Sequence, residues 1–469
     1  MSTFHVLILA AGKGTRMKSA RPKVLHHVAG APMIEYVLAT AAAIGAATRT
    51  VVVGYEADQL RSALGHHEDL RFVLQEPQLG TAHAVRQAEP VLAGERGILV
   101  LLSGDVPLLS VETVRALLAR HEETGAAVTV LTAVVDNPVG YGRIVRAGDQ
   151  VVGIVEHRDA SPAQREIREI NSGIYAFDLE GLFPALGQVA TNNAQREFYL
   201  PDLIAIYRRA GRKVAALAVD HPEEILGINT RAELAAMSER VWRTRRETLM
   251  ASGVTLEDPA TTYIDAGVTV GPDSVIRPGV SLVGRTTIGA RAAIHSGVRI
   301  VDSRLADDVT VLDHCLVVGA RLAERASVGP FAHIRPDSEV CAGARVGNFV
   351  ELKKTRLGPG SKASHLAYLG DATIGEKVNI GAGTITCNYD GVNKNRTVIE
   401  DGVFIGSDTQ LIAPVTIGRG AYVAAGSSIT KDVPAGALGI ARGRQENKEG
   451  WAALKKIQQE ADKARRSSG

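Results

Sequence analysis

Residues 264–300 read IDAGVTVGPDSVIRPGVSLVGRTTIGARAAIHSGVRI, and an aliphatic side chain returns at every sixth position of this stretch. A period of six fits neither a helix nor a single strand, so over this length it indicates a repeating coil. Coils this small bury their apolar face only by stacking, and we therefore predict a parallel β-helix. The predicted core positions are Ile264, Val270, Ile276, Leu282, Ile288, Ile294 and Ile300, then Leu316, Leu322, Val328, Ile334, Val340, Val346 and Leu352, then Ile399, Ile405, Leu411, Ile417, Val423 and Ile429.

Composition limits the possible functions. The chain has 469 residues, enough for two or three domains, and a formal net charge of +2 without a basic block, so nucleic acid is not expected as a partner. Cys315, Cys341 and Cys387 are odd in number and widely spaced, which favours a reducing compartment over a disulfide framework. The N-terminal apolar run is too short to span a bilayer. We predict a cytoplasmic protein without membrane insertion.

The chain before about residue 230 has a different pattern. Apolar runs at 6–9, 51–53, 98–102 and 128–135 predict strands buried on both faces, with amphipathic segments such as 111–124 between them. This alternation is typical of a mostly parallel α/β sheet, whose ligands bind at the carboxyl ends of the strands.

Four segments follow from these patterns. We expect an α/β domain at 1–230, a helical linker at 231–252, the β-helix at 253–441 and a polar, basic tail at 442–469 with a possible short helix. The linker carries Leu234, Met237, Val241 and Leu249 on one face. The six-residue frame breaks after Ile380, and the string TCNYDGVNKNR, residues 386–396, is predicted to project as a loop.

The first predicted strand runs directly into AAGKGTRM, residues 10–17. Gly12 and Gly14 allow a phosphate to approach the backbone, and Arg16 adds positive charge. Met17 replaces the third glycine of a dinucleotide fingerprint and no GK[ST] follows, so neither that fingerprint nor a P-loop is present. Taken alone, the glycines fit a structural strand–turn–helix connection equally well.

Further strings occur in a recognisable order: Pro22-Lys23, QEPQLGTAH at 75–83, SGDVPL at 103–108, GYGR at 140–143, IVEH at 154–157, NSG at 171–173 and GIN at 227–229. Together with residues 9–17 they resemble the sugar-phosphate nucleotidyltransferases, and this resemblance implies a Rossmann-like sheet. On residue type alone, Lys23 could be a solvated charge and Asn229 a turn residue. Asp105 ends a buried parallel strand, where ligands bind.

The resemblance also implies roles in nucleotidyl transfer. The transition state is crowded with negative charge, so Arg16 and Lys23 are expected to neutralise it, and Asp105 and Asn229 to hold Mg²⁺. Gln75, Gly80 and Thr81 would meet uracil, while Gly140, Glu156, Asn171 and Asn229 would meet the sugar. The implied contacts to UTP or its sugar product are Leu9, Ala10, Ala11, Gly12, Gly14, Lys23, Gln75, Gly80, Thr81, Ser103, Asp105, Gly140, Glu156, Asn171 and Asn229. Ala82 and Ser103 depart from the glycine and tyrosine common among relatives.

A second set of strings lies in the repeat region: IRP at 334–336, ELKK at 351–354, SHLAYLGD at 364–371, VNIGAG at 378–383 and GAGTITCNYDG at 381–391. With the first set, they resemble the bacterial bifunctional N-acetylglucosamine-1-phosphate uridyltransferase / glucosamine-1-phosphate N-acetyltransferases over nearly the whole chain except the tail. The implied fold is an α/β nucleotidyltransferase domain followed by a left-handed parallel β-helix of hexapeptide repeats.

Acetylation of an amine by a thioester needs a base, and the imidazole of His365 suits that task, although a lone surface histidine is more often structural. Cys387 is expected to be a packed residue, because direct transfer needs no acyl-enzyme. The resemblance assigns the phosphate of glucosamine 1-phosphate to Arg335, Lys353 and Lys394, and the sugar to Tyr368, Asn379, Asn388 and Tyr389. It assigns acetyl-CoA to Ala382, Asn388, Tyr389, Ser407, Ala425 and Arg442.

These expectations define a bifunctional enzyme. It would acetylate glucosamine 1-phosphate with acetyl-CoA, then transfer uridylyl from UTP to N-acetylglucosamine 1-phosphate in the presence of Mg²⁺. The products would be pyrophosphate and UDP-N-acetylglucosamine, a precursor of peptidoglycan and lipopolysaccharide. A homotrimer is expected by resemblance, with active sites at subunit boundaries. Two alternatives are a single-activity nucleotidyltransferase with a structural or regulatory β-helix, and a non-catalytic assembly subunit.

Overall fold

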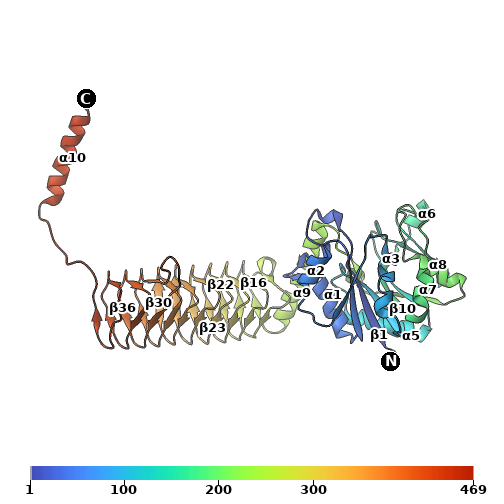
Figure 1. Cartoon of the computed structure of the whole chain (residues 1–469), viewed down its shortest axis with the longest axis horizontal. Helices are drawn as coiled ribbons and strands as arrows, with labels where there is room; N and C mark the ends of the chain where they lie inside the picture. Colours follow the sequence, from blue (N-terminus) through green and yellow to red (C-terminus); the bar gives the residue numbers. More distant parts are fainter. Residues whose placement is uncertain (1–2, 468–469) are drawn as a thin grey trace. The chain divides into compact units, whose positions relative to one another are not determined.

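A computed structural model describes residues 3–467 (Figure 1). Residues 1–2 and 468–469, the outer ends of the expected first domain and tail, lie outside the described residues. The chain forms two compact units that divide between Arg245 and Arg246. This division falls within helix α9 (Arg231–Ala251), in the segment expected to link the domains.

The first unit is built on a mixed, mostly parallel sheet with the strand order β11-β7-β10-β6-β1-β4-β5. Strand β10 is antiparallel to both of its neighbours in this order, whereas the other pairs are parallel. The strands are β1 (Phe4–Leu9), β4 (Thr48–Val53), β5 (Leu70–Leu74), β6 (Ile98–Ser103), β7 (Val128–Val134), β10 (Glu169–Asp178) and β11 (Val214–Ala218).

Both faces of this sheet are covered, because successive side chains of a strand point to opposite sides. Val6 and Ile8 of β1 belong to a core with residues of helices α1 (Met33–Ala43), α2 (Ala57–Ala63) and α5 (Val111–Thr124). Leu7 belongs to a second core with residues of α3 (Thr81–Arg86), α7 (Leu179–Leu186) and α8 (Asp202–Arg209). Continuous apolar runs therefore do mark strands buried on both sides.

The sheet positions the first site at a change in chain direction. From β1 the chain first adds β4 and β5 on one side, and then crosses to place β6 on the other side of β1. The loops that follow β1 and β6 consequently diverge and leave a crevice at the carboxyl ends of these strands, where ligands of open α/β sheets bind.

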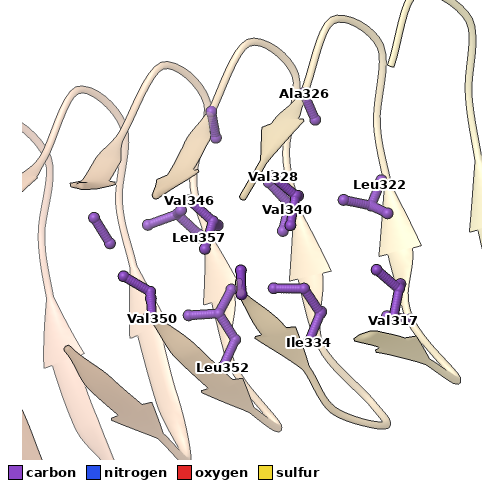
Figure 2. Close-up of a cluster of buried hydrophobic side chains, with 14 of the residues drawn as sticks. Val317, Leu322, Ala326, Val328, Ile334, Val340, Val346, Val350, Leu352 and Leu357 are labelled. Atoms are coloured by element: carbon purple, nitrogen blue, oxygen red, sulfur yellow. The ribbon is translucent and has the colours of Figure 1, made fainter. Parts of the chain in front are cut away.

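The second unit is a parallel β-helix formed by three ladders of short strands, which run from β12 (Thr255–Leu256) to β41 (Leu438–Gly439). Each ladder takes every third strand, apart from the final pair of β39 (Tyr422–Val423) with β41, so one coil contributes one strand to each face. Side chains of the aliphatic frame point inward, as Figure 2 shows for Val328, Ile334 and Val340, and each stacks on its counterpart in the next coil, as Ile334 does on Leu352. The predicted stacked architecture is confirmed.

The prediction was wrong at Leu316. In strand β22 (Leu316–Val318) the fully buried residue is Val317, and Leu316 is partly exposed. Val317 pairs with Ile334, whereas Ile276 pairs with Ile294, so the coil that begins at Val317 is one residue shorter, and counting back from Ile334 in sixes reaches Leu316. Because neighbouring strand residues point to opposite faces, a frame counted in strict sixes across this short coil selects the wrong residue.

The predicted break in the frame is also shorter than expected. Strand β34 (Ile385–Cys387) continues the coil, and Thr386 occupies a fully buried frame position opposite Leu411. Its hydroxyl accepts a hydrogen bond from the Gly370 amide at 2.7 Å and donates one to the Gly370 carbonyl at 2.9 Å. A threonine satisfied in this way can replace an aliphatic residue. The projecting loop therefore comprises only residues 388–396.

The tail contains helix α10 (Trp451–Ser467), whose residues are all exposed. Across residues 3–467, we find no helix with the length and apolar character needed to traverse a lipid bilayer.

Candidate active sites

A pocket of about 360 Å³ opens at the carboxyl ends of β1 and β6. Ten of the predicted nucleotide residues line it: Leu9, Ala10, Ala11, Gly12, Lys23, Gln75, Gly80, Thr81, Ser103 and Asp105. Gln78 and Glu197 also line it, and sequence reasoning missed both. The glycine-rich segment therefore forms one wall of a cavity, which favours a binding role over a purely structural turn.

Lys23 joins the two predicted magnesium ligands. Its Nζ donates a hydrogen bond to Oδ1 of Asn229 at 2.7 Å and another to Oδ2 of Asp105. The amide of Ile228 donates to the Asp105 carbonyl at 3.0 Å, which fixes the Asn229 loop beside the end of β6. A carboxylate oxygen and an amide oxygen thus converge on one cation, and these are the donors that a hard divalent ion takes.

Gly14 and Arg16 lie beside this cluster rather than in the pocket lining. Gly14 has φ of 60°, and a Cβ there would lie 2.7 Å from the Cβ of Lys23. The glycine therefore lets the backbone pack against Lys23. Arg16 is exposed in the 3₁₀ helix η1 (Thr15–Met17), with its charge free to reach a phosphate.

The predicted uracil-binding residues form a rigid corner of the pocket. The Gln75 side chain is 4% exposed, and its Nε2 donates to the Gly80 carbonyl at 2.9 Å. Gly80 has φ of 112°, and a Cβ there would lie 2.6 Å from the Phe198 carbonyl oxygen, so only glycine fits. Thr81 accepts a hydrogen bond from the Leu200 amide at 3.1 Å. These fixed polar groups can read the edge of a planar base.

A second pocket of about 210 Å³ shares Leu9, Thr81 and Ser103 with the first. It is lined by three predicted sugar residues, which are Gly140, Glu156 and Asn171. The hairpin of β8 (Arg143–Ala147) and β9 (Gln150–Val155) lies between Gly140 and Glu156 in the chain, and β10 supplies Asn171. The shared residues make the two pockets neighbours, as a two-part ligand requires.

Two side chains in the sugar pocket have distinctive surroundings. Burial raises the pKa of Glu156, and the nearby carboxylates of Asp159 and Asp202 raise it further. The hydroxyl of Tyr175, missed by sequence reasoning, donates to Oδ1 of Asn171 at 2.9 Å. Strand β10 shifts register against β7 between Asn171 and Tyr175, and such bulges re-aim side chains next to sites.

The two departures from the family pattern differ in position. Ser103 lines both pockets, so its substitution bears directly on a bound ligand. Ala82 is buried in α3 and lines neither pocket, so that departure concerns packing.

In the β-helix, His365 ends strand β30 (Lys362–His365) and is paired in register with Asn348 of β27 (Arg345–Asn348). Its Nδ1 lies 2.6 Å from Oδ1 of Asn348. An amide oxygen only accepts hydrogen bonds, so Nδ1 carries the hydrogen and Nε2 of the neutral ring keeps its lone pair. Asn348 was not predicted, although it lies one short coil before His365 in the sequence.

One ladder aligns the cations expected to bind phosphate. Ile334 pairs with Leu352, which places Arg335 and Lys353 at equivalent positions of adjacent coils. Nη1 of Arg335 donates to Oε1 of Glu351 at 2.8 Å, and this pair is partly exposed. Tyr368 lies on the next coil, where its hydroxyl would meet a Cβ added at Gly370 at 2.6 Å. Gly370 thus makes room for the phenol.

The projecting loop carries two predicted sugar residues, Asn388 and Tyr389, and one predicted phosphate residue, Lys394. Nδ2 of Asn388 donates to Oδ2 of Asp371, and Asn388 is buried. Tyr389 and Lys394 form an antiparallel bridge across the loop and are both exposed. Asn379 lies in strand β33 (Asn379–Ile380), paired with Lys362 of β30. Asp371, which anchors the loop, was not among the predicted residues.

The residues predicted to bind acetyl-CoA follow one edge of successive coils. The Asp408 amide donates to the Ala382 carbonyl at 2.7 Å, and the Gly426 amide donates to the Ser407 carbonyl at 2.8 Å. Nη1 of Arg442 donates to the Ala425 carbonyl at 2.7 Å. This edge offers a continuous partly exposed or exposed track for an elongated cofactor.

Cys387 is partly exposed, and burial raises the pKa of its thiol. A raised thiol pKa lowers the thiolate fraction at neutral pH. This environment agrees with the expectation that Cys387 is not an acyl carrier.

The sheet with its two joined pockets and the β-helix with its aligned cations define a two-unit transferase. A model of the MobA-like NTP transferase domain matches residues 6–166, and one of bacterial transferase hexapeptide (six repeats) matches 396–431. Bifunctional protein GlmU of Pelobacter propionicus is 50% identical over 452 residues, covering 96% of this chain and 98% of the relative. That of Exiguobacterium sp. is 52% identical over 453 residues, covering 96% and 99%. That of Syntrophotalea carbinolica is 52% identical over 445 residues, covering 95% and 96%.

The chain belongs to the family of bifunctional GlmU proteins. It is a bifunctional enzyme of UDP-N-acetylglucosamine synthesis, with a uridylyltransferase in the first unit and an acetyltransferase in the second. The predicted function is confirmed at this level, and neither the single-activity nor the non-catalytic alternative is supported.

Proposed function

We propose that residues 1–230 carry uridylyl transfer around Lys23 and that residues 253–441 carry acetyl transfer around His365. The helical linker, 231–252, is assigned no part in either reaction, and the tail, 442–469, contributes Arg442 to the acetyl-CoA site. The observation that carries this assignment is the convergence of Asp105 and Asn229 on Lys23 beside two joined pockets. The hydrogen bond between His365 and Asn348 supports the second half.

In uridylyl transfer, Gln75, Gly80 and Thr81 hold the uracil, and Glu156 and Asn171 hold the N-acetylglucosamine, with Gly140 beside it. Leu9, Ala10, Ala11, Gly12 and Ser103 shape the wall that faces the nucleotide, and Gly14 lets the backbone pack against Lys23. An oxygen of the sugar phosphate attacks the α-phosphorus of UTP, forming one P–O bond as the bond to pyrophosphate breaks. No protein nucleophile is needed.

Arg16 and Lys23 neutralise the charge that develops on the phosphates. Asp105 and Asn229 have the oxygen donors and convergence that a divalent cation requires. We assign Mg²⁺ to this pair, where the ion when bound would offset charge on the transferring and leaving phosphates.

In acetyl transfer, Nε2 of His365 takes a proton from the amine of glucosamine 1-phosphate. The amine nitrogen attacks the thioester carbonyl of acetyl-CoA, a C–N bond forms, and the C–S bond breaks to release coenzyme A, whose sulfur recovers a proton. Arg335, Lys353 and Lys394 bind the phosphate, and Tyr368, Asn379, Asn388 and Tyr389 orient the sugar. Ala382, Ser407, Ala425 and Arg442 contact acetyl-CoA, together with Asn388 and Tyr389.

The assembly we propose is a homotrimer in the cytoplasm, where the three free cysteines would stay reduced. A ladder of bulky side chains follows one corner of the prism beside His365: His314, Phe331, Phe349 and Leu366. All four have positive φ, a conformation costly for residues with a Cβ, and Phe349 is 57% exposed. Such exposed apolar side chains fit contact with a second copy of the chain.

Two variants test the assignment, and each is the control for the other. Lys23→Ala should abolish uridylyl transfer and spare acetylation, whereas His365→Ala should abolish acetylation and spare uridylyl transfer. Both half-reactions are assayed separately on the full chain. Loss of both activities in either folded variant, or retained acetylation by His365→Ala, would contradict the division of labour.

A further inference from the structure

A cluster of metal-binding side chains lies in the first unit, apart from the residues assigned to either reaction. Glu35 lies in the first turn of α1, and His66 and His67 follow the end of α2. One potential ligand atom from each residue lies within 4.8 Å of the other two. Two elements distant in the sequence therefore bring two imidazoles and a carboxylate to one point.

The geometry is close to that of a coordination shell. Nε2 of His67 lies 2.9 Å from Oε2 of Glu35, and Nε2 of His66 lies 3.3 Å from Oε1. Ligands of a tetrahedral zinc ion, each about 2.0–2.1 Å from the metal, are separated by roughly 3.3 Å. The same nitrogen of both rings faces the carboxylate, so one ion between them would reach all three residues with small side-chain rotations.

The surroundings leave room for an exchangeable ligand. The side chains of Glu35 and His67 are 24% and 22% exposed, whereas that of His66 is 56% exposed. The buried part of α1 (Ile34, Val37) and Leu60 of α2 share one hydrophobic core, which fixes the two backbones relative to each other. A preformed set of three protein ligands with one open side is typical of sites that complete their shell with water.

We propose that Glu35, His66 and His67 bind a borderline divalent transition metal, for which Zn²⁺ is the representative, and that the ion links α1 to the segment after α2. Two imidazoles and one carboxylate favour such a metal over Mg²⁺, which takes oxygen ligands. Binding to the folded chain alone stabilises it by mass action. Because protons compete for imidazole, the affinity falls as the pH is lowered.

The test uses the full chain without a histidine tag, with excess Mg²⁺ present to occupy the oxygen site of the uridylyltransferase. Zn²⁺ is titrated by calorimetry, and Co²⁺ by its visible absorption. The expected result is one equivalent bound per chain and a rise in Tm with Zn²⁺. His67→Ala and Glu35→Gln should each weaken binding at least 10-fold and remove the rise in Tm.

His221→Ala is the matched control, because His221 is exposed in the same unit and outside the cluster. It should bind Zn²⁺ as the wild type does. Circular dichroism and uridylyl transfer measured without zinc establish that the variants are folded. If His67→Ala does not fold, His66→Ala tests a second ligand of the same cluster. Absence of saturable binding by the wild type would overturn the proposal. Unchanged binding in the folded His67 and Glu35 variants would overturn it as well.

Discussion

Asn348 lies on the coil adjacent to that of His365 and accepts a hydrogen bond from its ring. The distance between Nδ1 of His365 and Oδ1 of Asn348 is 2.6 Å. The rigid stack of coils fixes both Cα positions, so the hydrogen bond sets the direction of the ring as well as its tautomer. Nε2 is thereby presented as the basic nitrogen.

The first prediction concerns this positioning residue. Asn348→Ala should lower the kcat of acetylation about 10- to 100-fold with little change in the KM for glucosamine 1-phosphate, because the base is misdirected but no substrate contact is lost. Steady-state kinetics of the acetyl half-reaction measures the split. Asn348→Asp, whose carboxylate accepts the same hydrogen bond, should recover much of the rate. An unrescued loss with a raised KM would point to a structural role instead.

The second prediction concerns the charge of Asp105. Asp105→Asn keeps an oxygen beside Asn229 but removes the negative charge, so the Mg²⁺ concentration for half-maximal uridylyl transfer should rise at least about 10-fold. Acetylation, which takes place in the other unit, should keep its wild-type rate. A Mg²⁺ titration of both half-reactions measures this. A variant with unchanged Mg²⁺ dependence would refute Asp105 as a ligand.

The third prediction follows from the raised pKa of Glu156, whose main cause is burial. A carboxyl group whose pKa is higher in the folded state than in the unfolded state loses stabilising influence as the pH rises through the folded pKa. Glu156→Gln removes this ionisation. The Tm of the variant relative to wild type should therefore increase from pH 5 to pH 8, as followed by thermal denaturation.

The same substitution should weaken sugar binding, because Gln offers one acceptor where the carboxylate offers two. We expect the KM for N-acetylglucosamine 1-phosphate to rise about 10- to 100-fold, as when a polar group of a sugar site loses its partner. Asp149→Asn, an exposed carboxylate in the turn between β8 and β9, is the control and should change neither quantity. An unchanged KM for N-acetylglucosamine 1-phosphate in Glu156→Gln would exclude Glu156 as a sugar-binding residue.

The fourth prediction concerns the aromatic corner. Phe349→Asp places a charge within the stacked Phe331–Phe349 pair, whose ring centroids lie 5.6 Å apart. If this corner contacts another copy, the mass measured by light scattering should fall from three chains to one. Acetylation should be lost with the assembly, while uridylyl transfer persists. Thr269→Asp, at an exposed position of β14 (Thr269–Val270), should remain trimeric. A trimeric Phe349→Asp protein would exclude this corner as the interface.

Local patterns predicted much of the fold, because they report what each segment buries. Val6 and Ile8 face one core and Leu7 the other, so an unbroken apolar run indicated a doubly covered strand. The stacked coils followed from the six-residue frame. Thr386 escaped prediction because a satisfied hydroxyl can fill an aliphatic position, and this depends on the Gly370 backbone of another coil.

The site was predictable where the residues occur in strings, and less so where distant segments meet. Lys23, Asp105 and Asn229 were named from their strings, but only the fold brings their polar atoms together. Asn348 and Asp371 were missed because each acts by a hydrogen bond to a residue on another strand or loop, and Tyr175 because the register shift within β10 sets its contact with Asn171. Single-sequence patterns carry no direct record of such partners.

The last prediction tests the corrected frame with two neighbouring residues of β22. Val317 is fully buried, whereas Leu316 is partly exposed. Val317→Ala removes two methyl groups from the stacked core and should lower the free energy of unfolding by about 2 kcal/mol. Leu316→Ala should cost less than about 1 kcal/mol despite the larger side chain removed, because its burial is incomplete. Denaturant-induced unfolding of the β-helix in both variants measures the difference in the free energy of unfolding. A larger loss for Leu316→Ala would restore the strict six-residue count back from Ile334 and reject the one-residue contraction between Val317 and Ile334.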